Sequence, residues 1–213
     1  MKLEVLLIIA GSYLIGSIST SVWISKVFFN KDIREYGSGN AGTTNTFRVL
    51  GKKAGIIVFI IDVFKGIAAT QIVLFFHEGH EPNVIIAYQM IAGIFAVIGH
   101  IFPLYTGFKG GKGVATLLGI CLGFLTLPTL LSAGVFTIVF LISGYVSLGS
   151  MTAGLSLPVF VLGIFHYTAI SITIFVLSIP ILLIITHKKN IVRLLNREEN
   201  KFQVNKKNRE QFR

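Results

Sequence analysis

Charged residues are scarce in this 213-residue sequence, where they make up 13% against about 25% in a typical soluble domain. A single cysteine is too few for a disulfide framework. Low-complexity disorder is excluded as well, because 53% of the residues are hydrophobic and 18 of them are Phe. With a mean hydropathy of +0.78, the composition is typical of an integral membrane protein.

Acidic residues are scarcer than basic ones, with nine Asp and Glu against 19 Lys and Arg and a net charge of +10. These bases do not form a stripe interleaved with exposed aromatic residues, which is the pattern expected of a nucleic-acid interface. We therefore expect no nucleic-acid partner and look to the membrane to explain the basic charge.

Long uncharged runs predict membrane-spanning helices, each of which needs about 20 apolar residues. Two such runs cover residues 5–25 and 82–102, and a third span, at residues 54–76, is interrupted by Asp62 and Lys65. The first is expected to be a retained helix rather than a signal peptide, because it is long and no small-residue cleavage site follows it. Residues 113–186 contain no charged side chain and are expected to hold further spans. Turns between these spans are expected near residues 128–132, 144–150 and 166–168.

The positions of the basic residues predict the orientation, because Lys and Arg are enriched in cytoplasmic loops. They concentrate in the loop after the first span, in the loop after the third span and in the C-terminal tail. If all three segments are cytoplasmic, an even number of spans separates Lys112 from His187, and four short spans fit this length better than two. The bases are Lys26, Lys31, Arg34, Arg48, Lys52 and Lys53, then Lys109 and Lys112, then Lys188, Lys189, Arg193, Arg197, Lys201, Lys206, Lys207, Arg209 and Arg213.

The predicted fold is an all-α, polytopic bundle of seven transmembrane helices, with the N-terminus outside and the C-terminus in the cytoplasm. Residues 1–202 are expected to form one membrane domain and residues 203–213 a basic cytoplasmic tail. Gly and Ser recur through the spans, which favours close helix packing. We find no internal repeat of the kind that underlies the inverted halves of many secondary transporters.

The first of three polar segments, GSGNAGTTNTFR at residues 37–48, has glycines in the spacing G-x-G-x-x-G. A dinucleotide-binding loop is excluded, because that motif needs a preceding strand inside a βαβ unit. Glycines still allow backbone N–H groups to converge on an anion, although a polar surface turn is the alternative. The candidate anion-binding residues are Ser38, Gly39, Asn40, Gly42, Thr43, Thr44, Asn45 and Arg48.

The second polar segment, GFKGGKG at residues 107–113, does not match a nucleotide-binding P-loop. Thr106 stands where that motif has its first Gly, and Gly113 stands where it has Ser or Thr. We expect a flexible cationic loop in which Gly110, Gly111 and Gly113 leave backbone amides open beside Lys112. An anchor on the cytoplasmic side is the alternative, and it explains the lysines but not the glycines.

The third polar segment begins at His187, and Asn190 and Arg193 follow at intervals of three, so a helix places them on one face. Glu199 is expected to reach back toward these residues. The alternative is a solvated amphipathic tail. We expect this alternative to hold for the residues beyond 202. Asp62 lies three residues before Lys65 inside the second span, and this pair is equally compatible with a functional site and with a self-neutralising structural contact.

Anion-binding loops at a bilayer surface suit a substrate with a phosphate in water and a chain in lipid. The sequence has no G-x-S-x-G elbow and no Cys beside a base, so direct transfer in a ternary complex is expected. A carrier for phosphorylated metabolites is the alternative, and it predicts sites near the bilayer midplane with two-sided access. An alcohol phosphotransferase would need clustered aspartates for a divalent metal ion, yet Asp32 and Asp62 are the only two.

The segments GSGNAGTTNTFRVLG, GHIFPLYTGFKGGKGVAT and HKKNIVRLLNREENKF resemble the three cytoplasmic motifs of the bacterial membrane acyl-phosphate:glycerol-3-phosphate acyltransferase family. The resemblance covers the whole chain in length, motif order and number of spans. It implies transfer of a fatty acyl group from acyl phosphate to the 1-hydroxyl of sn-glycerol 3-phosphate. The products would be lysophosphatidic acid and phosphate, in the first acylation step of phospholipid synthesis. No covalent acyl-enzyme, cofactor or metal ion is implied.

The same resemblance implies roles for individual residues. Asp62, Lys65 and Gly66 match a family pattern, whereas Arg197 stands where many members have Gly. The implied catalytic residues are Ser38, Arg48, Lys112, His187 and Asn190. The implied substrate-binding residues are Gly39, Asn40, Gly42, Thr43, Thr44, Asn45, Gly110, Gly111, Gly113, Ser150, Arg193 and Glu199.

The resemblance also implies partners and a location. The partners are acyl phosphate and glycerol 3-phosphate as substrates, the lipid bilayer, and a soluble enzyme that makes acyl phosphate. The location is the bacterial cytoplasmic (inner) membrane, crossed several times, with the active site on the cytoplasmic side.

Overall fold

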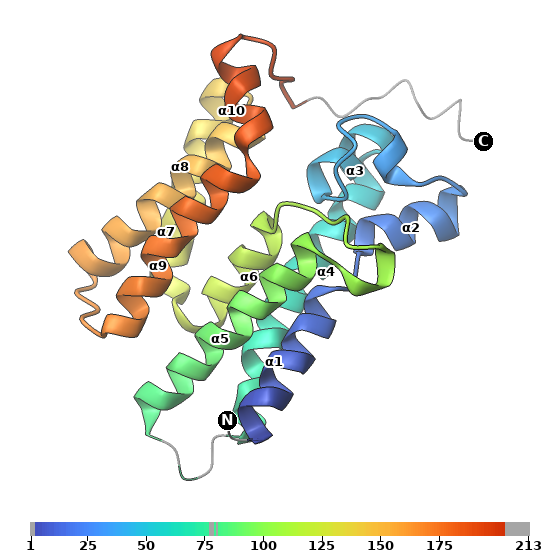
Figure 1. The fold of residues 1–213 in the computed structure, drawn as a ribbon. Coiled ribbons are helices and arrows are strands. Elements are labelled where there is room, and N and C mark those ends of the chain that lie inside the picture. The colour runs from blue at the N-terminus through green and yellow to red at the C-terminus, as the bar shows by residue number, and fades with distance from the viewer. Residues whose placement is uncertain (1–2, 77–78, 80, 203–213) are drawn as a thin grey trace. The chain divides into compact units, whose positions relative to one another are not determined.

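Helices make up the regular structure of the described part of the chain, which is residues 3–76, 79 and 81–202 of a computed structural model (Figure 1). They fall into two compact units, one ending at Phe124 and one running from Leu125 to Phe202. The all-helical class predicted from the sequence is confirmed. The predicted basic tail at residues 203–213 lies outside the described residues, and the single domain expected over residues 1–202 stays a prediction.

The first unit is built on packed apolar helices, and its polar loops gather at one end (Figure 1). Its elements are α1 (Leu3–Gly16), α2 (Thr20–Phe29), η1 (Ile33–Glu35), α3 (Thr43–Leu50), α4 (Lys52–Gln71), η2 (Ile72–Phe76), α5 (Pro82–Ile101), η3 (Leu104–Thr106) and α6 (Val114–Phe124). Helix α1 packs against α5, and α4 packs against α6. Fully buried Val58, Ala92, Ala96 and Ile120 fill the interior between these helices, which leaves the polar loops to form at the helix ends.

A break after Gly16 divides the first predicted span into α1 and α2, and two ionisable side chains of α4 hold this break. Lys65 Nζ donates to Ile18 O at 2.8 Å, and Thr20 Oγ1 donates to Asp62 Oδ1 at 3.0 Å. Lys65 Nζ also lies 2.8 Å from Asp62 Oδ1. Asp62 is 2% exposed and Lys65 is 5% exposed. The structure therefore favours the structural contact over the functional site for this pair.

The second unit is built of helices and has a short helix, α10, at its C-terminal end (Figure 1). Its elements are α7 (Thr126–Ser143), α8 (Val146–Pro158), η4 (Val159–Ile164), α9 (Ile170–Thr186) and α10 (Lys188–Leu195). The turn predicted near residues 166–168 is confirmed, since these residues precede α9, which begins at Ile170. The turn predicted near residues 144–150 is confirmed at left-handed Gly144 and at Tyr145, whereas residues 146–150 belong to α8. The turn predicted near residues 128–132 is wrong. The break lies at Leu125, and Pro128 stands in the first turn of α7, where proline is tolerated.

Five helical segments in the described part of the chain are long and apolar enough to cross a membrane, and α9 with α10 forms a sixth if their 64° bend is one span. Residues 113–186 hold α6, α7, α8 with η4, and α9, and the four spans expected there stay a prediction. The first of them, α6, has 11 residues, about 16 Å of helix against a hydrocarbon core of about 30 Å. The five segments are Leu3–Phe29, Lys52–Phe76, Pro82–Thr106, Thr126–Ser143 and Val146–Ile164.

Candidate active site

Residues 37–42, which we call the glycine loop, fold around the buried side chain of Asn45. Asn45 Oδ1 accepts a hydrogen bond from Ser38 N at 2.9 Å, and its Nδ2 donates to the carbonyls of Ile33 and Tyr36 at 3.1 and 3.0 Å. Gly37 has a φ of +62°, and a Cβ there would collide with Asn45 Oδ1. The amide of Asn45 is therefore engaged in shaping the glycine loop, which requires glycine at position 37.

Helix α3 begins directly after the glycine loop and rests on an apolar base. Val22, Ile33, Ala41 and Val49 form this base as one buried cluster. At the helix N-terminus, Thr43 Oγ1 is buried and has no hydrogen-bond partner among the described residues. The first turn of α3 thus offers a hydroxyl and the positive end of a helix dipole to an anion. Ser38 and Gly39 are exposed, while Asn40, Gly42, Thr43, Thr44 and Arg48 are partly buried.

Residues 107–113, which we call the lysine loop, fold back onto the end of α5. Gly110 N donates to Ile101 O at 3.0 Å, and Gly111 N donates to His100 O at 3.2 Å. These two amides are therefore engaged, and the open amides expected from the sequence are not observed at Gly110 and Gly111. Glycine is needed here for close packing instead, because a Cβ on Gly110 would collide with His100 O.

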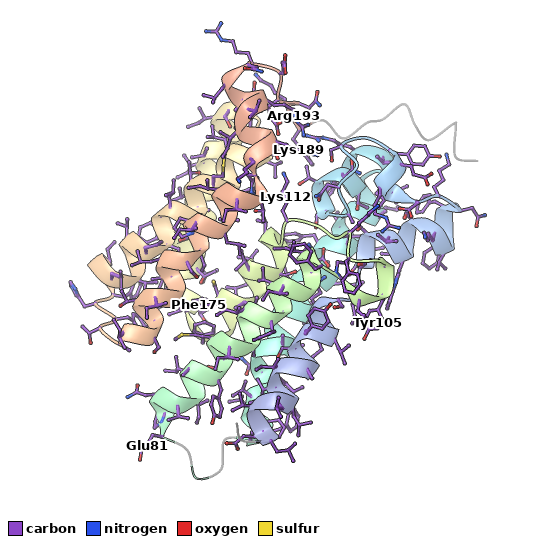
Figure 2. The ribbon with its side chains drawn as sticks, in the orientation of Figure 1. Glu81, Tyr105, Lys112, Phe175, Lys189 and Arg193 are labelled. Carbon is purple, nitrogen blue, oxygen red and sulfur yellow. The ribbon has the colours of Figure 1, made fainter. Side chains whose placement is uncertain are left out.

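The two loops lie against each other within the first unit. A Cβ built on Gly111 would lie only 3.0 Å from Ala41 O of the glycine loop. Lys112 follows, partly buried, in the loop before α6 (Figure 2), and Gly113 adopts a φ of +83°. The predicted residues of the first two segments are therefore brought together at one end of this unit.

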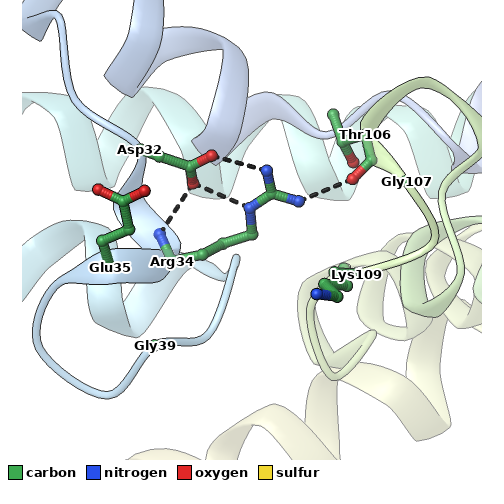
Figure 3. Close-up of a pocket in the computed structure, with 8 residues that line it drawn as sticks. Asp32, Arg34, Glu35, Gly39, Thr106, Gly107 and Lys109 are labelled. Carbon is green, nitrogen blue, oxygen red and sulfur yellow. Dashed lines mark hydrogen bonds and ion pairs between the residues drawn. The ribbon is translucent and has the colours of Figure 1, made fainter.

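An ion pair beside the loops joins them at a second point (Figure 3). Arg34 Nε and Nη2 donate to the two carboxylate oxygens of Asp32 at 2.8 and 2.6 Å, and Arg34 Nη1 donates to Thr106 O at 2.7 Å. These hydrogen bonds from Arg34 hold the pKa of Asp32 well below its usual range, and the Asp32 carboxylate raises the pKa of Arg34. A cavity of about 520 Å³ opens beside the pair. Its lining residues are Asp32, Arg34, Glu35, Gly39, Thr106, Gly107, Lys109 and Gly110.

In the second unit, His187 ends α9 and is 2% exposed. Its Nδ1 lies 2.9 Å from Leu183 O. A carbonyl oxygen only accepts hydrogen bonds, so Nδ1 is the donor in this contact. With Nδ1 engaged in this way, Nε2 is the ring nitrogen that is left to exchange a proton.

Asn190 and Glu199 meet on the C-terminal side of His187, as the sequence predicts for Glu199. Glu199 Oε1 accepts hydrogen bonds from Asn190 Nδ2 at 2.6 Å and from Ser147 Oγ on α8 at 2.9 Å. Arg193 Nε lies 3.8 Å from Glu199 Oε2. Glu199 is 8% exposed, so this carboxylate fixes α10 and the following segment onto α8.

Glu199→Ala is expected to destabilise the second unit by about 2–4 kcal/mol, because it leaves the buried donors of Ser147 and Asn190 without their shared acceptor. Circular dichroism of detergent-solubilised protein during heating measures the effect as a lower melting temperature. Glu198→Ala is the matched control, since its side chain is exposed. Equal melting temperatures for the two variants would contradict the role assigned to Glu199.

Ser150 lies inside α8 rather than in the preceding turn, with its Oγ donating to Val146 O at 2.8 Å. Several residues that shape the loops were not singled out from the sequence. The Asp32-x-Arg34 spacing directly before the glycine loop was the available signal for that ion pair. No sequence signal marks Thr106 or Ser147, because their contacts are with segments that are distant along the chain.

The chain is similar to known proteins over most of its length. The family model for glycerol-3-phosphate acyltransferases matches residues 6–197. A glycerol-3-phosphate acyltransferase of Streptococcus pneumoniae (strain Hungary19A-6) is 46% identical over 204 residues, which is 92% of this chain and 91% of the relative.

Two solved structures are similar along nearly the whole chain. One is PlsY (YgiH), an integral membrane glycerol 3-phosphate acyltransferase in its glycerol 3-phosphate form, with a TM-score of 0.83 and 38% identity over 93% of this chain and 96% of that one. The other is PlsY (YgiH) in a lysophosphatidic acid form, with a TM-score of 0.80 and 36% identity over 94% of this chain and 96% of that one. The chain is a multi-pass membrane protein that belongs to the glycerol-3-phosphate acyltransferase family.

Proposed function

We propose that this protein transfers a fatty acyl group from acyl phosphate to the 1-hydroxyl of sn-glycerol 3-phosphate, giving lysophosphatidic acid and phosphate. The packing of the glycine loop against the lysine loop, at one end of an apolar helical unit, carries this proposal. Both substrates bear a phosphate that such loops bind, and one bears a chain that belongs in lipid. The relatives solved in glycerol 3-phosphate and lysophosphatidic acid forms support this acceptor and this product.

Each candidate residue has a role that suits its position. Ser38 and the first turn of α3 hold a phosphate through a hydroxyl and the helix N-terminus, and Arg48 clamps a phosphate as a planar fork. Lys112 supplies a compact positive charge beside the tightly packed Gly110 and Gly111. The remaining substrate-binding residues proposed here are Gly39, Asn40, Gly42, Thr43, Thr44, Asn45, Gly113, Ser150, Arg193 and Glu199, of which Asn45 and Glu199 act by holding their neighbours.

The reaction proceeds by direct transfer, without an acyl-enzyme. The 1-hydroxyl oxygen attacks the acyl carbonyl carbon, and the tetrahedral intermediate collapses as the C–O bond to phosphate breaks. Acyl phosphate is a mixed anhydride with a good leaving group, so positioning and charge stabilisation provide most of the catalysis. The hydroxyl proton passes to His187 Nε2 or to a substrate phosphate, and Asn190 completes the polar pocket beside His187.

The chain crosses the bilayer seven times in this proposal, with the N-terminus outside and the C-terminus and active site on the cytoplasmic side of the bacterial inner membrane. The charge distribution supports this orientation, because the residues on either side of the glycine loop, the lysine loop and the α10 segment are basic. Helix α6 then crosses together with its flanking residues, since its own 11 residues are too few. A soluble enzyme that makes acyl phosphate supplies the donor.

The test is lysophosphatidic acid formation by purified, detergent-solubilised protein given glycerol 3-phosphate and palmitoyl phosphate. Parallel reactions contain palmitoyl-CoA in place of palmitoyl phosphate, or EDTA. Product from acyl phosphate alone, unchanged by EDTA, supports the donor, the acceptor and metal independence together. Absence of product from folded protein with every donor would overturn the proposal and direct attention to phosphate transport in proteoliposomes, as the carrier alternative requires.

Gly110→Ala is expected to lower kcat/KM at least about tenfold, because the added methyl group displaces the lysine loop from the His100 carbonyl. The same assay measures this loss. Gly134→Ala on α7 is the matched control, because a Cβ there meets nothing within 4 Å. Equal activity in both variants would show that the packing of the lysine loop on α5 does not position substrate.

A further inference from the structure

Asp32 and Arg34 lie outside the residues assigned to catalysis, yet their hydrogen bonds link the turn before the glycine loop to Thr106, which directly precedes the lysine loop. We propose that Asp32 and Arg34 are positioning residues, which set the glycine loop against the lysine loop and thereby determine the affinity for glycerol 3-phosphate. This inference rests on the proposed function, in which the two loops hold phosphate. The pair itself does not touch substrate in this role.

The geometry of the pair directs the Arg34 fork toward the lysine loop. Asp32 receives two parallel hydrogen bonds from Nε and Nη2, which leaves Nη1 to donate to Thr106 O at 2.7 Å (Figure 3). Asp32 Oδ1 also accepts from Arg34 N at 3.1 Å, which caps the η1 turn. A bidentate pair of this kind fixes the direction of the guanidinium as well as its distance. Arg34 therefore acts as a strut of defined length from η1 to Thr106.

The two residues joined by this contact, Arg34 and Thr106, lie next to the starts of the two loops. Two residues separate Arg34 from the glycine loop, and Thr106 is the residue directly before the lysine loop. Ser25 Oγ accepts from Ile33 N at 3.2 Å, which ties the Arg34 turn to α2. Ser19 Oγ lies 2.8 Å from Thr106 Oγ1 and ties the other end to the start of α2. Both ends of the Arg34 contact are thus tied to the α2 segment. A shorter side chain at position 34 therefore changes the distance between the glycine loop and the lysine loop.

Two phosphates held by two loops are sensitive to the separation of the loops, because a misplacement of about 1 Å weakens positioned contacts substantially. Arg34→Gln removes the positive fork and shortens the strut, whereas Arg34→Lys keeps the charge but cannot make two parallel bonds to Asp32 and a third to Thr106. Asp32→Asn keeps the side-chain size but removes the negative charge that orients the Arg34 guanidinium. The three variants are therefore expected to change the separation of the two loops by different amounts.

The experiment measures KM and kcat of these variants with glycerol 3-phosphate as the varied substrate. We expect Arg34→Gln to raise KM about tenfold while kcat changes less than about threefold, with Arg34→Lys and Asp32→Asn between it and the wild type. Glu81→Gln and Lys53→Gln are matched controls that remove one negative or one positive charge from exposed side chains of the same unit. A lower kcat with unchanged KM would overturn the inference, because loss of folded protein alone gives that pattern.

Hydrogen exchange of the same proteins separates this inference from the proposed function. Arg34→Gln is expected to speed amide exchange in residues 33–42 and in residues 104–113 together, whatever reaction the protein catalyses. Faster exchange confined to residues 33–42 would overturn the strut even if acyl transfer is confirmed. Coupled exchange with no acyl transfer by the wild type would support the strut between the loops, overturn the proposed function and remove the link to substrate affinity.

Discussion

Lys112→Ala is expected to lower kcat/KM for glycerol 3-phosphate by about 100-fold or more while the protein stays folded. The magnitude follows from removing a positive charge from the site proposed to bind phosphate and to stabilise developing negative charge, because in such sites the loss of one donor costs about 10²–10³ in rate. Ser38→Ala, Arg48→Ala and His187→Ala are expected to reduce transfer sharply as well. Initial rates of lysophosphatidic acid formation by purified variants measure all four effects.

The fold is expected to survive the loss of Lys112, because backbone contacts hold the lysine loop. Gly110 and Gly111 donate to carbonyls of Ile101 and His100, and these hydrogen bonds do not involve the lysine side chain. Lys53→Ala at the exposed start of α4 is the matched control for a lost surface charge. Wild-type activity in Lys112→Ala would remove this residue from the site, and wild-type activity in all four variants would remove the whole assignment.

The sequence predicts those features of the fold that depend on local composition. Uncharged runs and the prolines and glycines at their ends place most helices, and the glycine-rich segments mark the loops correctly. Leu125 was not recognised as a break because it is as apolar as its neighbours. The sequence prediction placed the helix boundary at Pro128, yet proline is acceptable in the first turn of a helix. The break after Gly16 was also missed, because it is held by Asp62 and Lys65 of another helix.

The candidate site could be predicted as a set of segments but not as a geometry. Amide groups at Gly110 and Gly111 were expected to be open, and in the structure they bond to the end of α5. Asn45 was expected to bind an anion, and its amide instead shapes the glycine loop. In both cases the partner is a backbone group whose position depends on how the chain folds, so spacing along the sequence carries no signal for it.

Asp62→Ala is expected to destabilise the first unit by about 3–5 kcal/mol, because it leaves the buried Lys65 without a compensating charge. For a chain of this length that loss corresponds to a drop in melting temperature on the order of 10 °C. Cys121 provides the measurement, since it is the single cysteine and is 3% exposed in α6 of the same unit. A maleimide dye that fluoresces on reaction with this thiol therefore reports unfolding of the first unit during heating.

A variant that removes both charges distinguishes two causes of the stability loss, namely a buried charge without a partner and the loss of individual contacts. Lys65→Met alone removes the donor to Ile18 O and leaves the buried Asp62 carboxylate without its counter-charge, so it is also expected to cost about 3–5 kcal/mol. The double variant Asp62→Ala/Lys65→Met buries no charge at this position, so it is expected to be more stable than the sum of the two single losses implies. Strictly additive losses in the double variant would show that the two side chains stabilise the break independently. A melting temperature at or above that of either single variant would instead establish that mutual neutralisation inside the unit is what makes both residues necessary.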